Sequence, residues 1–131
     1  MYARELSGMP DLDVLAWPDG SSYAIYAARV RAPEMRASIL AAMRRGGVQG
    51  DTTLSYVVPG LACYRAQGYS DDAVPNAVAW ARSVINFPNH PTLGDAQVSR
   101  IVQAVRDAFR QAAAARSDVH SPVRAAPLRT K

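Results

Sequence analysis

The feature of this sequence that most constrains its fold is an amphipathic pattern near the C-terminal end. Apolar side chains recur there every three to four residues, at Val98, Ile101, Val102, Val105 and Phe109. This is the spacing of one face of an α-helix. We predict that the helix begins near Gly94 and Asp95 and that the alanine run 112–115 extends it. Because such a helix must bury its apolar face against another layer, the chain needs a sheet or further helices beneath it.

Two runs near the N-terminal end are typical of β-strands. Leu12–Trp17 and Ser22–Val30 are rich in aromatic and branched apolar residues, which fit a pleated, half-buried surface. The residues between them, Pro18–Ser21, have the composition of a turn. We therefore expect the two strands to pair in antiparallel fashion, in the manner of a hairpin.

A second amphipathic helix is predicted from Pro33 onward, because proline is favoured in the first turn of a helix. Its apolar positions form one stripe, consisting of Met35, Ile39, Leu40 and Met43. Arg44 and Arg45 suit the C-terminal end of the helix dipole. The glycines 46–47 that follow are typical of a helix end.

The remaining segments complete the pattern. Tyr2–Ser7 is expected to form one or two helical turns, and Val48–Val58 to be irregular or a short strand. A further helix is expected over Val74–Val84, with Asp71 or Asp72 as its cap. In chain order these elements predict an α+β fold, in which three to four helices cover a small antiparallel or mixed sheet.

The composition is that of a globular domain. Apolar residues make up 49% of the 131 residues and charged residues 20%. No apolar run approaches the roughly 20 residues of a membrane span, and the start of the sequence lacks the features of a secretory signal. The single cysteine, Cys63, is expected to be a small buried thiol in a protein of the reducing cytoplasm.

The net charge of +4 comes almost wholly from arginine, because the only lysine is Lys131. A nucleic-acid binder concentrates basic residues on one face with interleaved aromatics. These arginines are scattered among acids, so we predict neither a nucleic-acid nor a membrane partner. From Arg116 the sequence is polar and contains two prolines, which predicts a basic, disordered tail over 116–131.

The residues alone reveal no active site. The two histidines, His90 and His120, and the one cysteine do not have the spacing of a metal site. The glycines at 46–47 follow a helix instead of opening one, so they do not form a phosphate loop. No catalytic, cofactor-binding or metal-binding residue is predicted.

Five segments taken together resemble the C-terminal small domain of the DegT/DnrJ/StrS-type aminotransferases, which act on nucleotide-linked sugars with pyridoxal phosphate. In chain order they read YARELSGMPDL, SSYAIYAARV, MRASILAAMRRGGV, SYVVPGLACY and FPNHPTLGDAQVSRIV. The resemblance covers about residues 2–110, and its most specific part is the last segment. It implies the fold of the C-terminal domain of a fold-type I aminotransferase over residues 10–115. Residues 1–9 would then be the remnant of the helix between the two domains.

The resemblance implies pyridoxal 5′-phosphate as the cofactor of the family. In the family the large domain supplies the Schiff-base lysine, the carboxylate that pairs with the pyridinium nitrogen, and the phosphate cup. This sequence has no lysine that could take that role, and the cofactor needs an amine to anchor its aldehyde. We therefore expect the isolated chain to bind no cofactor and to be inactive.

The resemblance also implies substrate-binding positions at Ser55, Tyr56 and His90. Ser55 stands where many members carry a histidine, and Leu61 stands about where a second histidine is common. For Tyr56 a partly buried structural role is the alternative. Gly94 replaces the usual threonine cap of the last helix.

Three hypotheses about function follow. The first is a C-terminal or split component of a sugar aminotransferase, whose partner is a large-domain chain. The second is a freestanding, non-catalytic module that binds itself or a homologous full-length enzyme. The third, a basic binder of nucleic acid or acidic lipid, would show binding that falls steeply with salt.

Overall fold

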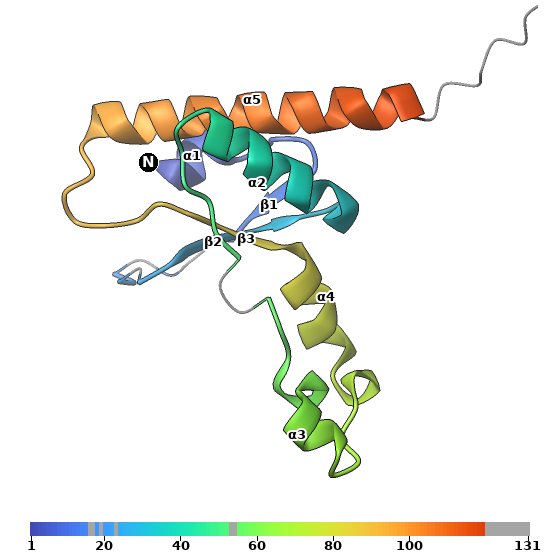
Figure 1. The fold of residues 1–131 in the computed structure, drawn as a ribbon. Coiled ribbons are helices and arrows are strands. Elements are labelled where there is room, and N and C mark those ends of the chain that lie inside the picture. The colour runs from blue at the N-terminus through green and yellow to red at the C-terminus, as the bar shows by residue number, and fades with distance from the viewer. Residues whose placement is uncertain (16–17, 19, 23, 53–54, 120–131) are drawn as a thin grey trace, which may run out of the picture.

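The computed structural model describes residues 1–15, 18, 20–22, 24–52 and 55–119. In this part of the chain a three-stranded antiparallel sheet is combined with five α-helices, which confirms the predicted α+β class. Helices α2 (Arg36–Arg45) and α5 (Asp95–Val119) pack against each other over one face of the sheet (Figure 1). A segment that carries the short helix α3 (Ala62–Arg65) projects away from this body on the other side.

The sheet has the order β1-β2-β3. β1 (Leu12–Val14) and β2 (Tyr26–Val30) pair in antiparallel fashion, as predicted. β2 is shorter than the predicted Ser22–Val30, because the chain at Ile25 is bent and its side chain is exposed instead of joining a pleated surface. β1 ends at Val14. Several residues of the predicted strands and turn lie outside the described residues, namely 16–17, 19 and 23.

The third strand follows directly from a helix. Helix α4 (Pro75–Ser83) ends one residue before the predicted end, and the chain continues as β3 (Val84–Phe87). β3 pairs in antiparallel fashion with β2, and its four side chains are buried. On its outer edge Asn86 forms a single antiparallel bridge with Asp51. The segment after α2 thus adds one bridge to the sheet.

The core lies between the sheet and the two long helices, and both predicted stripes contribute to it. Met35, Ile39 and Met43 are buried on the side of α2. On α5 all five residues of the predicted pattern are buried, namely Val98, Ile101, Val102, Val105 and Phe109, and Ala108 and Ala112 are buried with them. Ile85 of β3 is fully buried beneath them. The hydrophobic periodicity was therefore sufficient to identify the core face of each helix.

The C-terminal end of α2 shows why two glycines follow it. Gly47 has a φ of 76°, a left-handed conformation that glycine adopts without steric cost. Its N–H bonds to the carbonyl of Arg44, and the N–H of Val48 bonds to the carbonyl of Met43 at 2.9 Å. These two bonds form a Schellman motif, which satisfies carbonyls that the helix leaves unpaired.

Helix α5 is longer than predicted. It continues through Val119, so residues 116–119 belong to the helix instead of the predicted tail. The side chain of Arg116 forms an ion pair with Glu34. This pair helps to hold the C-terminal part of α5 in place. From His120 onward the predicted tail lies outside the described residues. Neither α5 nor any other helix of the described part is apolar enough over sufficient length to cross a membrane.

The N-terminal end of α5 is only half capped. The side-chain oxygen Oε1 of Gln97 accepts a hydrogen bond from the N–H of Gly94 at 2.9 Å. This is one of the two reciprocal bonds of a capping box, and the other requires a hydroxyl at position 94.

We expect Gly94→Thr to raise the free energy of unfolding by about 0.5–1 kcal/mol, because it adds the missing cap and restricts the unfolded chain. A Cβ at position 94 meets only Gln97 Oε1, at 3.8 Å, so the site has room. Urea denaturation would measure the change. Gln97→Ala is the matched control and should lower stability, whereas an unchanged or lowered stability of Gly94→Thr would contradict this account of the cap.

Helix α1 (Tyr2–Leu6) is joined to the sheet by an aromatic cluster. The ring of Tyr2 lies 5.0 Å from that of Tyr26 and 5.9 Å from that of Phe87, measured between centroids. Its hydroxyl donates a hydrogen bond to the carbonyl of Pro88 at 2.8 Å. Burial, and then repulsion from Tyr26, raise the pKa of Tyr2 to about 12.

This raised pKa predicts a loss of stability at alkaline pH. In the unfolded chain Tyr2 loses its proton near pH 10, whereas in the folded chain it does so near 12, so unfolding is increasingly favoured between these values. Over this range the free energy of unfolding loses the contribution of Tyr2, which is about 2–3 kcal/mol. Urea denaturation between pH 9 and 12 should show a shallower fall for Tyr2→Phe than for the parent. Identical slopes would contradict it.

The predicted cap of α4 is wrong. The residue before α4 is Val74, and no side chain caps the helix there. Asp71 lies in a separate 3₁₀ turn, and its carboxylate pairs with Arg65 at 3.1 Å. The reason is that residues 55–74, here called the arm, fold into short turns of their own, which no hydrophobic periodicity in the sequence indicates.

Candidate functional site

The described residues do not fit a pyridoxal phosphate site. The cofactor is held through its aldehyde by a primary amine, and lysine is absent from residues 1–119. The one lysine, Lys131, lies outside the described residues. No group of three histidine, cysteine or acidic side chains in the described part could hold a metal ion. The described residues therefore offer neither the amine that anchors pyridoxal phosphate nor a set of metal ligands.

Of the predicted substrate-binding residues, His90 lines a hollow of the body. This hollow has a volume of about 380 Å³ and is bounded by the edge of β3, by the segment around Asp51 and by the residues that follow β3. The Nδ1 atom of His90 lies 2.9 Å from Thr92 Oγ1. The ring itself is exposed to solvent.

Asn86 is the polar side chain deepest in this hollow. It is 6% exposed, and its Nδ2 atom has no hydrogen-bond partner among the described residues. Its main chain is fixed by two bonds with Asp51, of 2.8 and 3.1 Å. A buried amide without a partner is costly, and sequence reasoning missed this residue because nothing in the local pattern distinguishes it.

Ser55 and Tyr56 do not join His90 in the hollow. They lie at the start of the arm, directly after residues outside the described part, and both are exposed. The alternative prediction of a partly buried Tyr56 is wrong, because 59% of this residue is accessible. The structure therefore divides the three predicted residues between two places.

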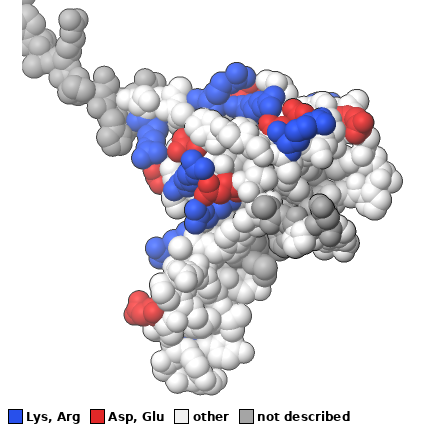
Figure 2. All heavy atoms as spheres, turned by 180° about the vertical axis from the view of Figure 1, so that it is seen from behind, with Lys and Arg blue, Asp and Glu red and all other residues white. Residues whose placement is uncertain are grey.

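The arm carries most of the large apolar side chains that the described chain exposes. They are Tyr56, Val58, Leu61, Tyr64 and Tyr69, each at least 38% accessible. Every residue from 61 to 70 is exposed. Figure 2 shows that charged side chains gather over the body, whereas the arm below it is almost uncharged on this face. Cys63 also lies here and is exposed, so the prediction of a buried thiol is wrong.

The arm is ordered by contacts within itself. The rings of Tyr64 and Tyr69 meet edge to face with centroids 6.1 Å apart, and Arg65 pairs with Asp71. A Cβ at Gly60 would overlap the carboxylate of Asp71, so only glycine allows this approach. A defined surface that is both apolar and exposed is typical of an interaction site.

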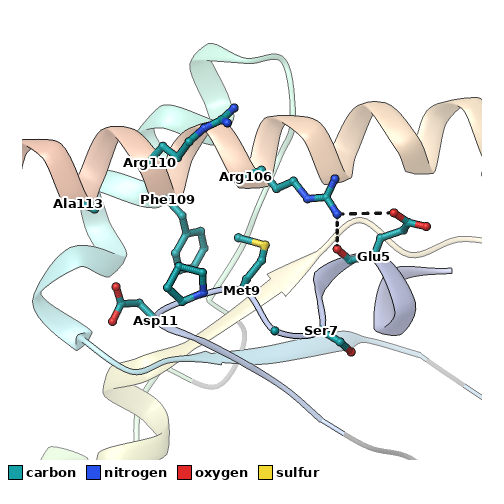
Figure 3. A pocket seen from close by; sticks show the side chains of 10 residues that line it. Glu5, Ser7, Met9, Asp11, Arg106, Phe109, Arg110 and Ala113 are labelled. Carbon is teal, nitrogen blue, oxygen red and sulfur yellow. Dashed lines mark hydrogen bonds and ion pairs between the residues drawn. The ribbon is translucent and has the colours of Figure 1, made fainter.

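A second hollow, of about 410 Å³, lies between the loop after α1 and helix α5 (Figure 3). Met9 and Phe109 form its apolar floor. On its rim Arg106 donates to the backbone oxygen of Glu5 at 2.5 Å and lies 3.6 Å from its carboxylate. This pair ties α1 to α5, which makes a structural role the sufficient explanation of Arg106.

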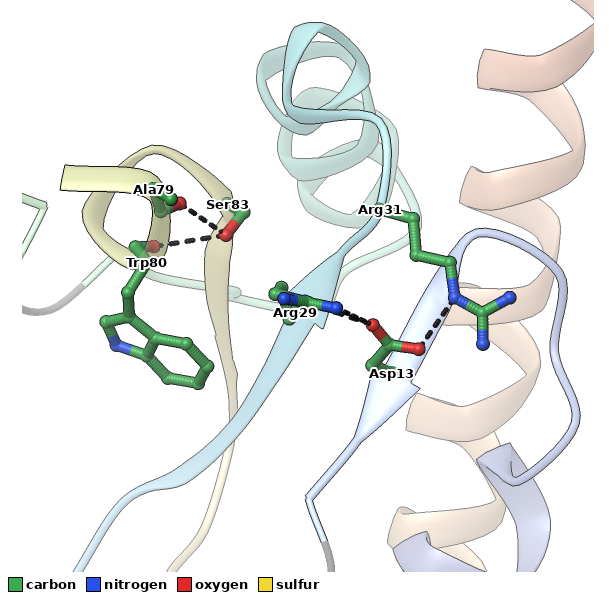
Figure 4. A network of polar contacts seen from close by, with 6 residues as sticks. All are labelled: Asp13, Arg29, Arg31, Ala79, Trp80 and Ser83. Atoms are coloured by element: carbon green, nitrogen blue, oxygen red, sulfur yellow. Dashed lines mark hydrogen bonds and ion pairs between the residues drawn. The ribbon is translucent and has the colours of Figure 1, made fainter. Parts of the chain in front are cut away.

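A polar network joins β1 to the chain at the end of β2 (Figure 4). Asp13 of β1 accepts hydrogen bonds from Arg29 at 2.7 Å and from Arg31 at 2.6 Å. These bonds, first that of Arg29 and then that of Arg31, lower the pKa of the Asp13 carboxyl. The carboxylate is therefore ionised at neutral pH and is not suited to act as a general base.

Comparison with models of protein families found a match. The model of the DegT/DnrJ/EryC1/StrS aminotransferase family matches residues 1–106, which includes the arm and the residues around His90. Comparison with curated proteins found no match.

Solved structures share this fold. Spr1654 from Streptococcus pneumoniae, assigned as a sugar aminotransferase, matches with a TM-score of 0.77 and 23% identity over 88% of this chain and 30% of its own. DesV from S. venezuelae, solved with a ketimine intermediate, gives 0.71 and 23% over 81% and 28%. The aminotransferase TlmJ from Streptoalloteichus hindustanus gives 0.70 and 23% over 84% and 29%.

The described fold thus corresponds to less than a third of the length of each of these proteins. Spr1654 has also been solved in a form with pyridoxal 5′-phosphate (PLP) and in a PMP form. At this level of identity the likeness concerns the fold alone.

Proposed function

This chain belongs to the DegT/DnrJ/EryC1/StrS aminotransferase family, and from that premise we propose that it acts as the small-domain component of a PLP-dependent sugar aminotransferase. In this proposal a second chain or domain supplies the lysine and the cofactor. The small domain completes the enzyme and has no activity by itself. We place the protein in the cytoplasm, where its exposed cysteine stays reduced.

The apolar arm is the observation that carries the proposal. Leu61 and Tyr64 are exposed on an ordered segment with few charges. Exposing such side chains to water is unfavourable by about 25 cal/mol per Å² of apolar surface, and aromatic residues with few charges are typical of the centre of an interface. A domain that packs against a larger one has a surface of this kind.

The missing amine is the second support. The chemistry of the family depends on an electron sink that PLP supplies when it is held by a lysine. Among residues 1–119 only the N-terminal amino group is a primary amine. The contribution left to this chain is therefore binding: the arm with Tyr56, and the hollow with His90, are the surfaces that would contact the partner or its substrate. The residues 1–9 would continue the connection between the domains.

Purification of a tagged full-length chain from its native source tests the proposal. We expect a lysine-bearing aminotransferase large domain to co-purify, and the complex to show the absorbance of bound PLP. The chain purified alone should retain no cofactor after incubation with PLP and desalting. Lys131→Arg is the matched control and should behave as the parent in both experiments.

Two results would overturn the proposal. One is retention of PLP by the isolated chain, with transaminase activity, in both the parent and Lys131→Arg. The other is a monodisperse homo-oligomer of this chain that has no affinity for any lysine-bearing partner. The second result would instead support the freestanding interaction module.

A further inference from the structure

The hollow between the loop after α1 and helix α5 has an apolar floor that the core holds in place. Its volume is about 410 Å³, and Met9 and Phe109 form the floor (Figure 3). Phe109 is 4% exposed and belongs to the core, and Met9 packs against that core. The shape of the hollow is therefore set by the packing of the fold.

The hollow also has one charge that nothing in the described part compensates. The carboxylate of Asp11 lines it and forms no ion pair or hydrogen bond with a described residue. The other charges of the lining are engaged, because Arg106 lies 3.6 Å from the carboxylate of Glu5 and Arg110 pairs with Asp107. A free carboxylate beside an apolar floor suits an occupant that combines an apolar side chain with a cation.

The backbone fixes Asp11 in this position. Its φ of 61° is left-handed, a conformation that aspartate adopts more readily than most residues. Its carbonyl accepts a hydrogen bond from the N–H of Arg31 at 2.9 Å. Figure 3 shows Asp11 on the side of Ala113, with Arg106 and Glu5 on the opposite side of the hollow. The free carboxylate thus lies toward the C-terminal end of α5.

The sequence that follows α5 has the matching chemistry. Residues 120–131, which lie outside the described residues, read HSPVRAAPLRTK and contain three cations and no acid. Leu128 is followed directly by Arg129, which places an apolar side chain next to a cation. The segment therefore complements both the floor of the hollow and its free carboxylate.

The segment is also long enough to reach the hollow. Because an α-helix rises about 1.5 Å per residue, Phe109 lies about 15 Å back along the axis from Val119. Nine residues lead from Val119 to Leu128, and extended chain covers about 3.3 Å per residue, or about 30 Å in all. Ser121 and Pro122 favour a turn, and a proline cannot continue the helix. A reversal there leaves enough chain for Leu128 to meet the floor.

We propose that residues 120–131 of this same chain bind in the hollow, with Leu128 against Met9 and Phe109 and with a cation of the segment beside Asp11. The bound segment covers the floor and ties the C-terminal part of the chain to the loop between α1 and β1. The inference does not depend on the proposed function, since the hollow and the arm share no residue.

Paramagnetic broadening in the NMR spectrum of the full-length chain tests the proposal. A nitroxide is attached to Thr130→Cys in a Cys63→Ser background, where it modifies the only thiol. We expect it to broaden the amide signals of Met9 and Phe109 and to leave those of the arm sharp.

Three variants of the labelled chain measure what holds the segment. Leu128→Ser should lower the ratio of bound to free segment at least tenfold, because it removes the apolar side chain. Ala126→Ser is the matched control: it places the same hydroxyl two residues earlier and should leave the ratio unchanged. Asp11→Asn removes the charge but tolerates the left-handed backbone, and it should lower the ratio about two- to fivefold.

Two results would overturn the binding of the segment. One is that the signals of Met9 and Phe109 are no broader than those of the arm. The other is equal broadening in the parent and in Leu128→Ser. An unchanged ratio in Asp11→Asn would overturn the role given to the charge.

A mixed sample identifies the chain that supplies the segment. It combines isotope-labelled chain without nitroxide and nitroxide-labelled chain without isotope. Sharp signals of Met9 and Phe109 in this mixture, together with broadening in the singly prepared sample, support binding within one chain. Broadening in the mixture would assign the hollow to the segment of a second copy and would overturn binding within the chain.

Discussion

Leu61→Asp combined with Tyr64→Asp should abolish co-purification of the large-domain partner, with a loss of affinity of at least a hundredfold. Both side chains are exposed on the arm, and buried apolar or aromatic anchors of this kind each contribute about 2 kcal/mol or more to an interface. Placing two carboxylates in an apolar interface adds a desolvation cost. The measurement is quantitative pull-down, followed by titration of the isolated partners.

A matched control distinguishes the arm from a general effect of charge. Ala41→Asp adds one carboxylate, half the charge of the double arm variant, at an exposed position of α2 on the body, and it should leave co-purification intact. If the arm variant still binds its partner normally, the arm is not the docking surface. The family membership would remain, because it rests on residues 1–106 as a whole.

The elements with hydrophobic periodicity could be predicted from the sequence. The stripes of α2 and α5 identified their buried faces, since a period of 3.6 residues reports directly which side of a helix lies against the core. The pairing of β1 with β2 followed from composition and a turn. The exact strand ends did not, because a residue such as Ile25 has a high strand propensity and yet lies in a bend with its side chain exposed.

The arm could not be predicted, for a physical reason. Its short turns are held by contacts between residues several positions apart, such as Arg65 with Asp71 and Tyr64 with Tyr69. No burial pattern along the sequence marks such contacts, since most arm residues are exposed and none is buried. One signal was present in the sequence: Arg65 is the only charged residue between Asp51 and Asp71, although three tyrosines lie in this stretch.

The candidate site was predicted only in part. The resemblance selected His90, which lines a hollow, and Tyr56, which is exposed on the arm. It gave no indication of Asn86, because the burial of that amide depends on the bridge to Asp51, a contact between residues far apart in the sequence.

A pair of truncations tests whether the arm exists for stability or for binding. Ile85→Ala should lower the free energy of unfolding by about 2–5 kcal/mol, because it leaves a cavity at a fully buried position of β3. Leu61→Ala removes a side chain of comparable size from the arm and should change stability by no more than about 0.5 kcal/mol, since that residue is exposed. Urea denaturation of both variants gives the comparison.

The contrast between the two variants decides the interpretation of the arm. A small effect of Leu61→Ala on unfolding, together with a large effect on co-purification, means that this apolar side chain contributes little to the folded chain and much to a complex. Equal losses of stability for Leu61→Ala and Ile85→Ala would mean that the arm is part of the core in solution. Its apolar surface would then be buried within the chain, and the argument for a docked large domain would lose its main support.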